Sequence, residues 1–380
     1  KSLPLSTLSL LGLQSTAHFT QPLQHSKIPE SQFKTNRKRP SESQTLPNRA
    51  PAKTTMPKSS KKKGSYAGGT VSAASNPNSA SAASASSTKS TGNLLDPVKA
   101  YGQNFLKNPA IIDAIVQKSN IKPTDTVLEI GPGTGNLTVK LLERCARLNA
   151  IEYDPRMVRE VTKRVEGTPE SNKLTVIHGD ALKTAFPFFN VCVANVPYQI
   201  SSGLVFKLLG HRPFFKCAVM MFQEEFALRL SARPGESLYC RLSVNTQLLA
   251  RVDQLMKVGR NNFRPPPKVE SRVVRIEPRN PPPPVNFTEW DGMVRLLFNR
   301  KNKTIFSVLN NKSTYKILEE NVKTKAAFDN VKGAVEIDVK KVIAEVCEME
   351  EYKDKRVTRL DIDDLLKLLA EFNERGIHFA

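Results

Sequence analysis

The segment Ala194–Ser202 has the sequence ANVPYQISS and brings an amide, a backbone carbonyl and an aromatic ring close together. The exocyclic amine of adenine is a poor nucleophile because its lone pair is delocalised into the ring. Asn195 Oδ1 and the carbonyl of Val196 can accept the two amine hydrogens and aim the lone pair at an electrophilic methyl group. Pro197 stiffens the turn, and Tyr198 offers a face on which the base can stack. An ordinary Asn-x-Pro turn would have the same residues, so this segment alone leaves both interpretations open.

A glycine-rich turn lies in Val127–Asn136, with the sequence VLEIGPGTGN. Gly131, Gly133 and Gly135 follow an apolar run and precede a helical pattern, so a ligand could approach the backbone closely at the positive end of that helix. The G-x-G-x-G spacing differs from the G-x-G-x-x-G that suits a dinucleotide pyrophosphate. A tight strand-to-helix connection without a ligand would use the same glycines.

Acidic residues end the next two apolar runs. Glu152, in LNAIEYD, lies about 20 residues beyond the glycines, where a carboxylate can accept both hydroxyls of a ribose. Asp180, in HGDAL, can receive an adenine amino group, although its position alone does not decide for a ligand contact. Asp154 comes directly before Pro155 and fits a helix cap.

The glycines and Glu152 together favour an adenosine-containing cofactor, and on their own they leave NAD and S-adenosylmethionine both open. The turn at Asn195–Tyr198 decides for S-adenosylmethionine, because it suits methyl transfer to an amine and because no hydride-transfer residue is recognisable. The methylated amine is transiently cationic and loses a proton to water. We therefore expect that neither a general base nor a metal is needed.

The elements that must position these residues alternate between short apolar runs and helix-period segments from Tyr101 onward. This alternation predicts an α/β fold with a parallel sheet covered on both faces. The expected strands are Thr126–Ile130, Leu148–Glu152, Leu174–His178, Val191–Ala194 and Ala218–Phe222, with Leu248–Val258 and Ser271–Glu277 as a closing pair. The expected helices are Leu137–Arg144, Pro155–Val165, Leu204–Leu209, Trp290–Phe298, Ile305–Asn310, Val339–Met349 and Ile362–Phe372.

Composition divides the chain into four parts. Residues 1–95 are rich in small polar residues and predict a disordered, basic, low-complexity tail, in which residues 1–55 precede Met56 and could lie outside the native protein. The other predicted parts are a methyltransferase domain at 96–279, a proline-rich linker at 280–286 and a C-terminal helical domain at 287–380.

The chain is strongly basic, with 57 Lys and Arg against 36 Asp and Glu and a formal net charge of +21. This excess favours a polyanionic partner, either a nucleic acid or an acidic membrane surface. The five cysteines are scattered without metal-ligand spacing, which favours buried free thiols in a reducing compartment. No stretch approaches the roughly 18–20 apolar residues of a membrane helix, so we expect a soluble intracellular protein.

The order of YGQNFL, LEIGPGTGNLT, IEYD, GDAL, NVPYQISS and FRPPPKVES resembles the ribosomal RNA adenine dimethyltransferases, and most of all the eukaryotic small-subunit enzymes. The resemblance extends from about Pro97 to Ala380. It implies a Rossmann-like class I S-adenosylmethionine-dependent methyltransferase with a mostly parallel seven-stranded sheet. It also implies transfer of two methyl groups to N6 of each of two adjacent adenosines in a hairpin near the 3′ end of 18S rRNA during ribosome biogenesis.

The resemblance also implies roles for individual residues. Asn195, Val196, Pro197 and Tyr198 would form the catalytic turn, and Tyr198 and Phe263 would stack on the substrate base. The segment Gln103–Leu106 could fold over the cofactor as a lid, or could be no more than a polar helix cap. The cofactor contacts implied by the resemblance fall on Asn104, Leu106, Gly131, Gly133, Glu152, Asp180 and Asn195.

The C-terminal region would bind rRNA. Arg295, Arg300, Lys301 and Lys303 could grip phosphates there, or form a merely solvated face.

Two rival interpretations stay open. A non-catalytic assembly factor could keep this fold only to bind rRNA, and a DNA adenine methyltransferase would share the Asn-x-Pro-Tyr turn. The resemblance implies a monomer that acts on small-subunit rRNA and pre-ribosomal particles, with no metal and no membrane. It also implies that the protein is located in the nucleus and nucleolus, with the cytoplasm as an additional location. A mitochondrial location is the weaker alternative.

Overall fold

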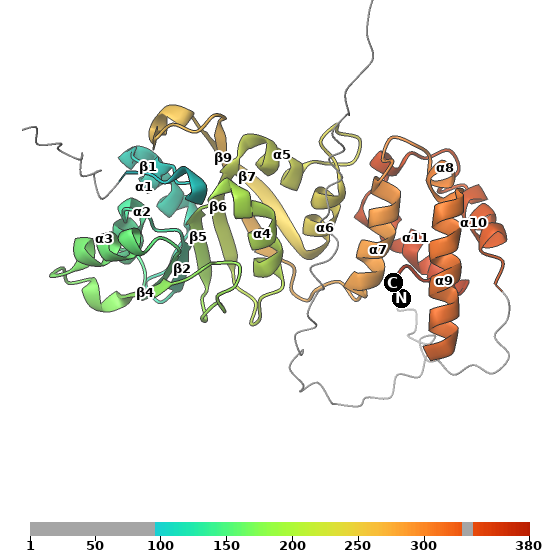
Figure 1. Cartoon of the computed structure of the whole chain (residues 1–380), viewed down its shortest axis with the longest axis horizontal. Helices are drawn as coiled ribbons and strands as arrows, with labels where there is room; N and C mark the ends of the chain where they lie inside the picture. Colours follow the sequence, from blue (N-terminus) through green and yellow to red (C-terminus); the bar gives the residue numbers. More distant parts are fainter. Residues whose placement is uncertain (1–95, 329–336) are drawn as a thin grey trace, which may run out of the picture. The chain divides into compact units, whose positions relative to one another are not determined.

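The computed structural model describes residues 96–328 and 337–380 (Figure 1). The predicted tail at 1–95, with the possible extension at 1–55, lies outside the described residues. Within the described part, a seven-stranded sheet has the strand order β4-β3-β2-β5-β6-β9-β7. The strands β2 to β6 run parallel to one another, and β9 is antiparallel to both β6 and β7. The mostly parallel α/β sheet is therefore confirmed.

The predicted strands agree closely with those observed. The sheet strands are β2 (Thr126–Ile130), β3 (Arg147–Glu152), β4 (Leu174–His178), β5 (Val191–Asn195), β6 (Cys217–Gln223), β7 (Ala250–Val258) and β9 (Ser271–Pro278). One prediction was wrong at its start, since Leu248 and Leu249 close a helix and β7 begins at Ala250. Two short strands, β1 (Phe105–Leu106) and β8 (Phe263–Arg264), form a separate antiparallel pair that the sequence did not reveal.

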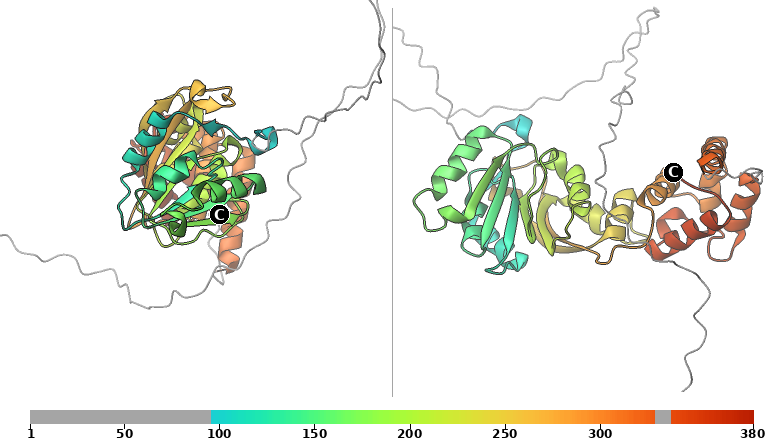
Figure 2. Two further views of the ribbon diagram at one scale, coloured as in Figure 1. Left: turned by 90° about the vertical axis from the view of Figure 1, so that its left-hand side faces the viewer. Right: turned by 90° about the horizontal axis from the view of Figure 1, so that it is seen from below.

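Alternate residues of the inner strands face two hydrophobic cores, as the period of a strand requires. In β6, Val219 and Met221 pack in the core under α1 and α2, while Met220 and Phe222 pack in the core under α4 and α5. Figures 1 and 2 show helices on both faces of the sheet. These helices are α1 (Pro109–Ser119), α2 (Asn136–Leu142), α3 (Pro155–Val165), α4 (Ser201–Leu209), α5 (Glu224–Ser231) and α6 (Arg241–Leu249).

Helix α3 begins where its sequence predicts. Asp154 Oδ1 accepts a hydrogen bond from Arg156 N at 2.9 Å, and Pro155 occupies the first turn, where no amide hydrogen is needed. The predicted cap is confirmed. Because α3 starts at once after β3, Glu152 is held at the carboxyl edge of the sheet.

The C-terminal region is helical, as predicted, and includes one long helix, α9, that the sequence did not reveal. Its core contains Trp290, whose Nε1 donates to Asn245 Oδ1 at 3.0 Å, and it extends across the linker to Val244 and Leu248 of α6. The helices are α7 (Phe287–Phe298), α8 (Ile305–Leu309), α9 (Lys312–Phe328), α10 (Val339–Glu348) and α11 (Ile362–Glu374). Helix α6 thus belongs by sequence to the sheet domain and by packing also to the helical core.

Candidate active site

Two neighbouring pockets open at the carboxyl edge of the parallel strands. The first is lined by the glycine turn, Glu129, Glu152, the segment 102–106 and the turn Asn195–Tyr198. The second is lined by Tyr101, Tyr153 and Asp180, together with Gly131 and Pro197, which line both pockets. The strand-end residues singled out in the sequence are brought together because carboxyl ends of neighbouring parallel strands share one edge of a sheet.

The residues Gln103–Leu106, here called the strap, cross the first pocket and contact its other walls. Gln103 Nε2 donates to Asp154 Oδ2 at 2.8 Å, and the carbonyl of Asn104 accepts from Asn195 Nδ2 at 2.9 Å. The carbonyl of Leu106 accepts from Asn136 Nδ2 at 2.8 Å, and β1 pairs with β8. Both Asn104 and Leu106 line the pocket, so the strap has the position expected of a lid.

The glycine turn leaves room where a side chain would intrude. Gly131 and Gly133 have φ values of 68° and 55°, a backbone conformation that glycine adopts readily. A Cβ on Gly131 would meet nothing closer than 3.8 Å, so the backbone is open toward the pocket. A Cβ on Gly133 would lie 2.9 Å from Phe105 Cδ1, so this glycine admits the strap instead.

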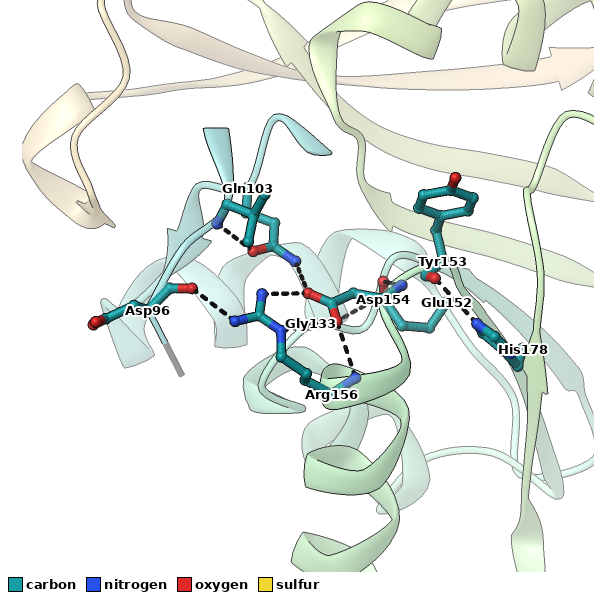
Figure 3. Close-up of polar contacts among 9 residues, drawn as sticks. Asp96, Gln103, Gly133, Glu152, Tyr153, Asp154, Arg156 and His178 are labelled. Carbon is teal, nitrogen blue, oxygen red and sulfur yellow. Dashed lines mark hydrogen bonds and ion pairs between the residues drawn. The ribbon is translucent and has the colours of Figure 1, made fainter. Parts of the chain in front are cut away.

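Glu152 lies at the end of β3 with both carboxylate oxygens engaged by backbone amides (Figure 3). Gly133 N donates to Oε2 at 3.0 Å, and Asp154 N donates to Oε1 at 2.9 Å. Burial raises the pKa of Glu152, while these two amides oppose the increase. The carboxylate is therefore fixed in direction and retains lone pairs for a hydroxyl donor in the pocket.

Three residues of the turn after β5 are held by hydrogen bonds to distant parts of the chain. Asn195 lines the first pocket, its Nδ2 is committed to the carbonyl of Asn104, and none of the described residues donates to its Oδ1. Val196 N donates to Met221 O at 3.3 Å. The Tyr198 hydroxyl lies 2.8 Å from Ser271 Oγ, which fixes the ring at the pocket wall. Asn195, Val196, Pro197 and Tyr198 thus line one cavity, although their catalytic roles stay predictions.

Asp180 lines the second pocket, near the start of the loop that follows β4. Its Oδ1 accepts from Leu182 N at 2.9 Å, which leaves Oδ2 for a ligand. Lys207 of α4 secures this loop, because its Nζ donates to the carbonyls of Ala181 at 2.7 Å and Thr184 at 2.5 Å. This support could not be predicted from a local pattern, since the lysine follows the acid by 27 residues.

Glu129 is a pocket residue that the sequence analysis missed. It lies within β2, is 1% exposed, and its Oε2 has no hydrogen-bond partner among the described residues. Burial raises the pKa of Glu129 to about 8, and the nearby charge of Glu152 adds to this effect. An acidic residue inside an apolar strand, two positions before a glycine turn, was the signal that could have found it.

Phe263 does not take the position predicted for it. Its side chain is 1% exposed and packs in the core with Leu106, Val258 and Val273, because β8 pairs with β1 beneath the strap. It lines neither pocket. In this conformation the ring supports the strap and offers no face to a base, so Tyr198 is the stacking surface that the structure presents.

The four basic residues noted near α7 fall into two pairs. Arg295 forms an ion pair with Asp291 at 2.9 Å, and Lys301 Nζ donates to the carbonyls of Ser237 and Tyr239. Arg300 and Lys303 are exposed, and none of the described residues forms an ion pair with either. The second pair is therefore the one without a competing carboxylate or carbonyl among the described residues.

Three further observations concern the described residues. Within 96–328 and 337–380, no group of three or more His, Cys, Asp or Glu could hold a metal ion. No described helix is long and apolar enough to cross a membrane. All five cysteines are unpaired thiols, and four of them are buried.

Comparison with known proteins gives a consistent result. The family model described as "Ribosomal RNA adenine dimethylase" matches residues 97–355. The chain is 61% identical over 284 residues to the "Probable dimethyladenosine transferase" of Dictyostelium discoideum, covering 74% of this chain and 90% of that protein. It is 51% identical over 284 residues to the "Dimethyladenosine transferase" of Saccharomyces cerevisiae, covering 73% of this chain and 89% of that protein.

Two solved structures share the fold. A dimethyladenosine transferase from Plasmodium falciparum is 47% identical with a TM-score of 0.68, covering 73% of this chain and all of that one. The 23S rRNA methyltransferase ErmE is 27% identical with a TM-score of 0.52, covering 71% of this chain and all of that one.

Proposed function

The chain belongs to the ribosomal RNA adenine dimethylase family, and on that premise we propose that it methylates N6 of two adjacent adenosines in a hairpin near the 3′ end of small-subunit (18S) rRNA. The observation that carries the proposal is the orientation of Asn195. Its Nδ2 is occupied by the carbonyl of Asn104, so its Oδ1 is the atom that this pocket residue can offer as an acceptor for an amine hydrogen. Such an acceptor suits an exocyclic amine and would not suit a carbonyl oxygen.

The residues that line the first pocket match the chemical groups of S-adenosylmethionine. Gly131 leaves an open backbone, Glu152 offers a fixed carboxylate for the ribose, and the partnerless Oε2 of Glu129 suits a cationic amino group. Asp180 in the second pocket offers an acceptor for an adenine amino group. When bound, this cofactor supplies an electrophilic methyl group.

The residues of this chain then have only to hold and direct the target amine. Asn195 Oδ1 and the carbonyl of Val196 accept its two hydrogens, which turns the lone pair toward the methyl group. Tyr198 stacks on the flipped base, and its bond to Ser271 fixes the ring. The surplus proton leaves to water.

For substrate rRNA, we propose that the C-terminal helical domain supplies phosphate contacts. Arg300 and Lys303 are exposed on the connection after α7 and have no ion-pair partner among the described residues. Reversing both charges should weaken rRNA binding. It should also make the slope of log K against log salt concentration shallower, by an amount that corresponds to about two phosphate contacts. The same reversal at Lys163, exposed on α3, is the control.

One assay tests the catalytic assignment. Purified protein is incubated with labelled S-adenosylmethionine and small-subunit particles, and the label is mapped on the RNA. We expect label on two adjacent adenosines, and its loss in Asn195→Ala but not in Asn149→Ala, which changes the same residue type on β3 outside both pockets.

Other outcomes would favour the rivals. No label with the wild type would favour an assembly factor that only binds rRNA, and label on duplex DNA would favour a DNA enzyme. We further propose that the protein acts in the nucleus and nucleolus during ribosome biogenesis, as a monomer on pre-ribosomal particles. Fractionation and imaging of the tagged protein test this location.

A further inference from the structure

The strap is tied to the cofactor side of the sheet by one side-chain pair, Gln103 and Asp154 (Figure 3). Gln103 Nε2 donates to Asp154 Oδ2 at 2.8 Å, which joins segments 51 positions apart in the chain. At the other end of the same amide, Gln103 Oε1 accepts from Val98 N at 2.9 Å. Both ends of the amide are therefore engaged, and its orientation is fixed.

Asp154 also belongs to the wall that faces the pocket. Its backbone N donates to Glu152 Oε1, while Glu152 Oε2 accepts from Gly133 N. A continuous series of hydrogen bonds thus runs from the strap through Asp154 and Glu152 to the glycine turn. Any group held by Glu152 in the pocket lies next to the residue that holds the strap.

Asp154 has partners other than the strap. Asp154 is 1% exposed, its Oδ1 caps α3, and Arg156 Nη2 forms an ion pair with its Oδ2 at 2.6 Å. Capping needs only Oδ1, so the bond from Gln103 to Oδ2 is additional to the needs of the helix. That bond ties the strap, which is short and irregular outside its two β-bridge residues, to a fixed point.

Besides its pairing with β8, the strap has three further contacts with other walls of the same pocket. Asn104 is bonded to Asn195, Phe105 covers Gly133, and Leu106 is bonded to Asn136. Since the strap crosses the pocket, a bound cofactor can enter and leave only when some of these ties break. Gln103–Asp154 is the tie nearest to the ribose-binding carboxylate.

We propose that Gln103 and Asp154 are positioning residues that clasp the strap over the cofactor, and that opening of this clasp limits the exchange of S-adenosylhomocysteine for fresh S-adenosylmethionine. The inference rests on the proposed function, because each N6,N6-dimethyladenosine consumes two cofactors. The clasp must then open between the first and the second methyl group on one nucleotide. A looser clasp weakens cofactor binding and speeds this exchange.

The test measures cofactor binding without RNA, so it does not depend on the methyl acceptor. Calorimetry gives the Kd of S-adenosylhomocysteine and of S-adenosylmethionine, and hydrogen exchange reports the opening of residues 97–106. Gln103→Met keeps the length of the side chain and removes the bond to the carboxylate. We expect about ten-fold weaker binding of both ligands, because the closed fraction of the strap falls.

A reciprocal exchange separates clasping from simple structural support. Gln103→Glu sets two carboxylates against each other and should weaken binding more than Gln103→Met. Asp154→Asn keeps an oxygen to cap α3 but loses the ion pair with Arg156. Combining Gln103→Glu with Asp154→Asn restores an amide–carboxylate pair of reversed direction, so affinity should recover above that of either single variant.

Matched controls make the same chemical changes elsewhere. Gln254→Met removes a glutamine that bonds to Ser231, and Asp338→Asn alters the cap of α10. Both should leave cofactor binding and strap exchange at wild-type values. Thermal unfolding of every variant identifies those that fail to fold. The cofactor Kd and the hydrogen exchange of residues 97–106 are then compared among the remaining single and double variants.

Two results would overturn the clasp. One is unchanged cofactor Kd and unchanged exchange of residues 97–106 in Gln103→Met; the other is a double variant no better than its two parents. A wild type that binds neither ligand would also overturn it. A wild type that binds both ligands but methylates no rRNA would refute the proposed function and leave the clasp standing.

Discussion

The buried carboxyl of Glu129 should make the cofactor-free protein less stable as pH rises. Burial raises its pKa from an ordinary 4.5 to about 8. Between these two values the folded chain holds a proton that the unfolded chain has released, so the free energy of unfolding falls with increasing pH. This contribution is fully present below pH 4.5 and is lost as pH rises toward 8.

The expected size follows from the same two pKa values. Each pH unit within this window removes about 1.4 kcal/mol, so the group costs about 3 kcal/mol at pH 7 relative to pH 4.5, and about 1 kcal/mol more near pH 8. Solvent screening has little effect on this free-energy cost, because the side chain is 1% exposed. Glu129→Gln keeps the shape of the side chain and removes the titration.

The assay is urea unfolding of wild type and Glu129→Gln, without cofactor, at several pH values from 5 to 8. We expect the variant to gain about 3 kcal/mol relative to wild type across this range, as an order of magnitude. Glu319→Gln, at an exposed position on α9, is the control and should follow the wild type. A difference between wild type and Glu129→Gln that stays constant with pH would refute the reasoning.

Three further predictions concern the pocket walls. Gly133→Ala and Gly167→Ala should each lower the free energy of unfolding by about 1 kcal/mol, because both glycines have positive φ. Titration with cofactor should show weaker binding only for Gly133→Ala, because its new Cβ meets the strap. Tyr198→Phe keeps the stacking ring and should lose only a few-fold in kcat/KM, whereas Tyr198→Ala should lose about 10- to 100-fold; similar losses in both would contradict stacking. Lys207→Met should loosen the Asp180 loop and raise the KM for cofactor several-fold with kcat retained; an unchanged KM would show that the loop needs no such support.

The sequence predicted the sheet well because the signal was local. Strand β2 and helix α3 were found with the same bounds as observed, since apolar runs, glycines and an Asp-Pro cap mark their ends. The strand-end positions of Glu152 and Asp180 followed from the same pattern. Helices α5, α6 and α9 were missed. The apolar residues of α6 are divided between two cores, and in α9 the buried residues are Thr314 and Leu318, so helical periodicity is weak in both.

What only the tertiary structure decided is how distant segments bind one another. The sequence placed Asn195 in a turn, but the direction of its amide depends on the carbonyl of Asn104, 91 positions earlier. The burial of Phe263 depends on a pairing of the same kind, between β8 and β1. Residue type and spacing therefore determined the fold and the chemistry that the site can support. The strap, its clasp and the orientation of the acceptor were decided by long-range hydrogen bonds, because a local pattern contains no information about which distant partner closes each bond.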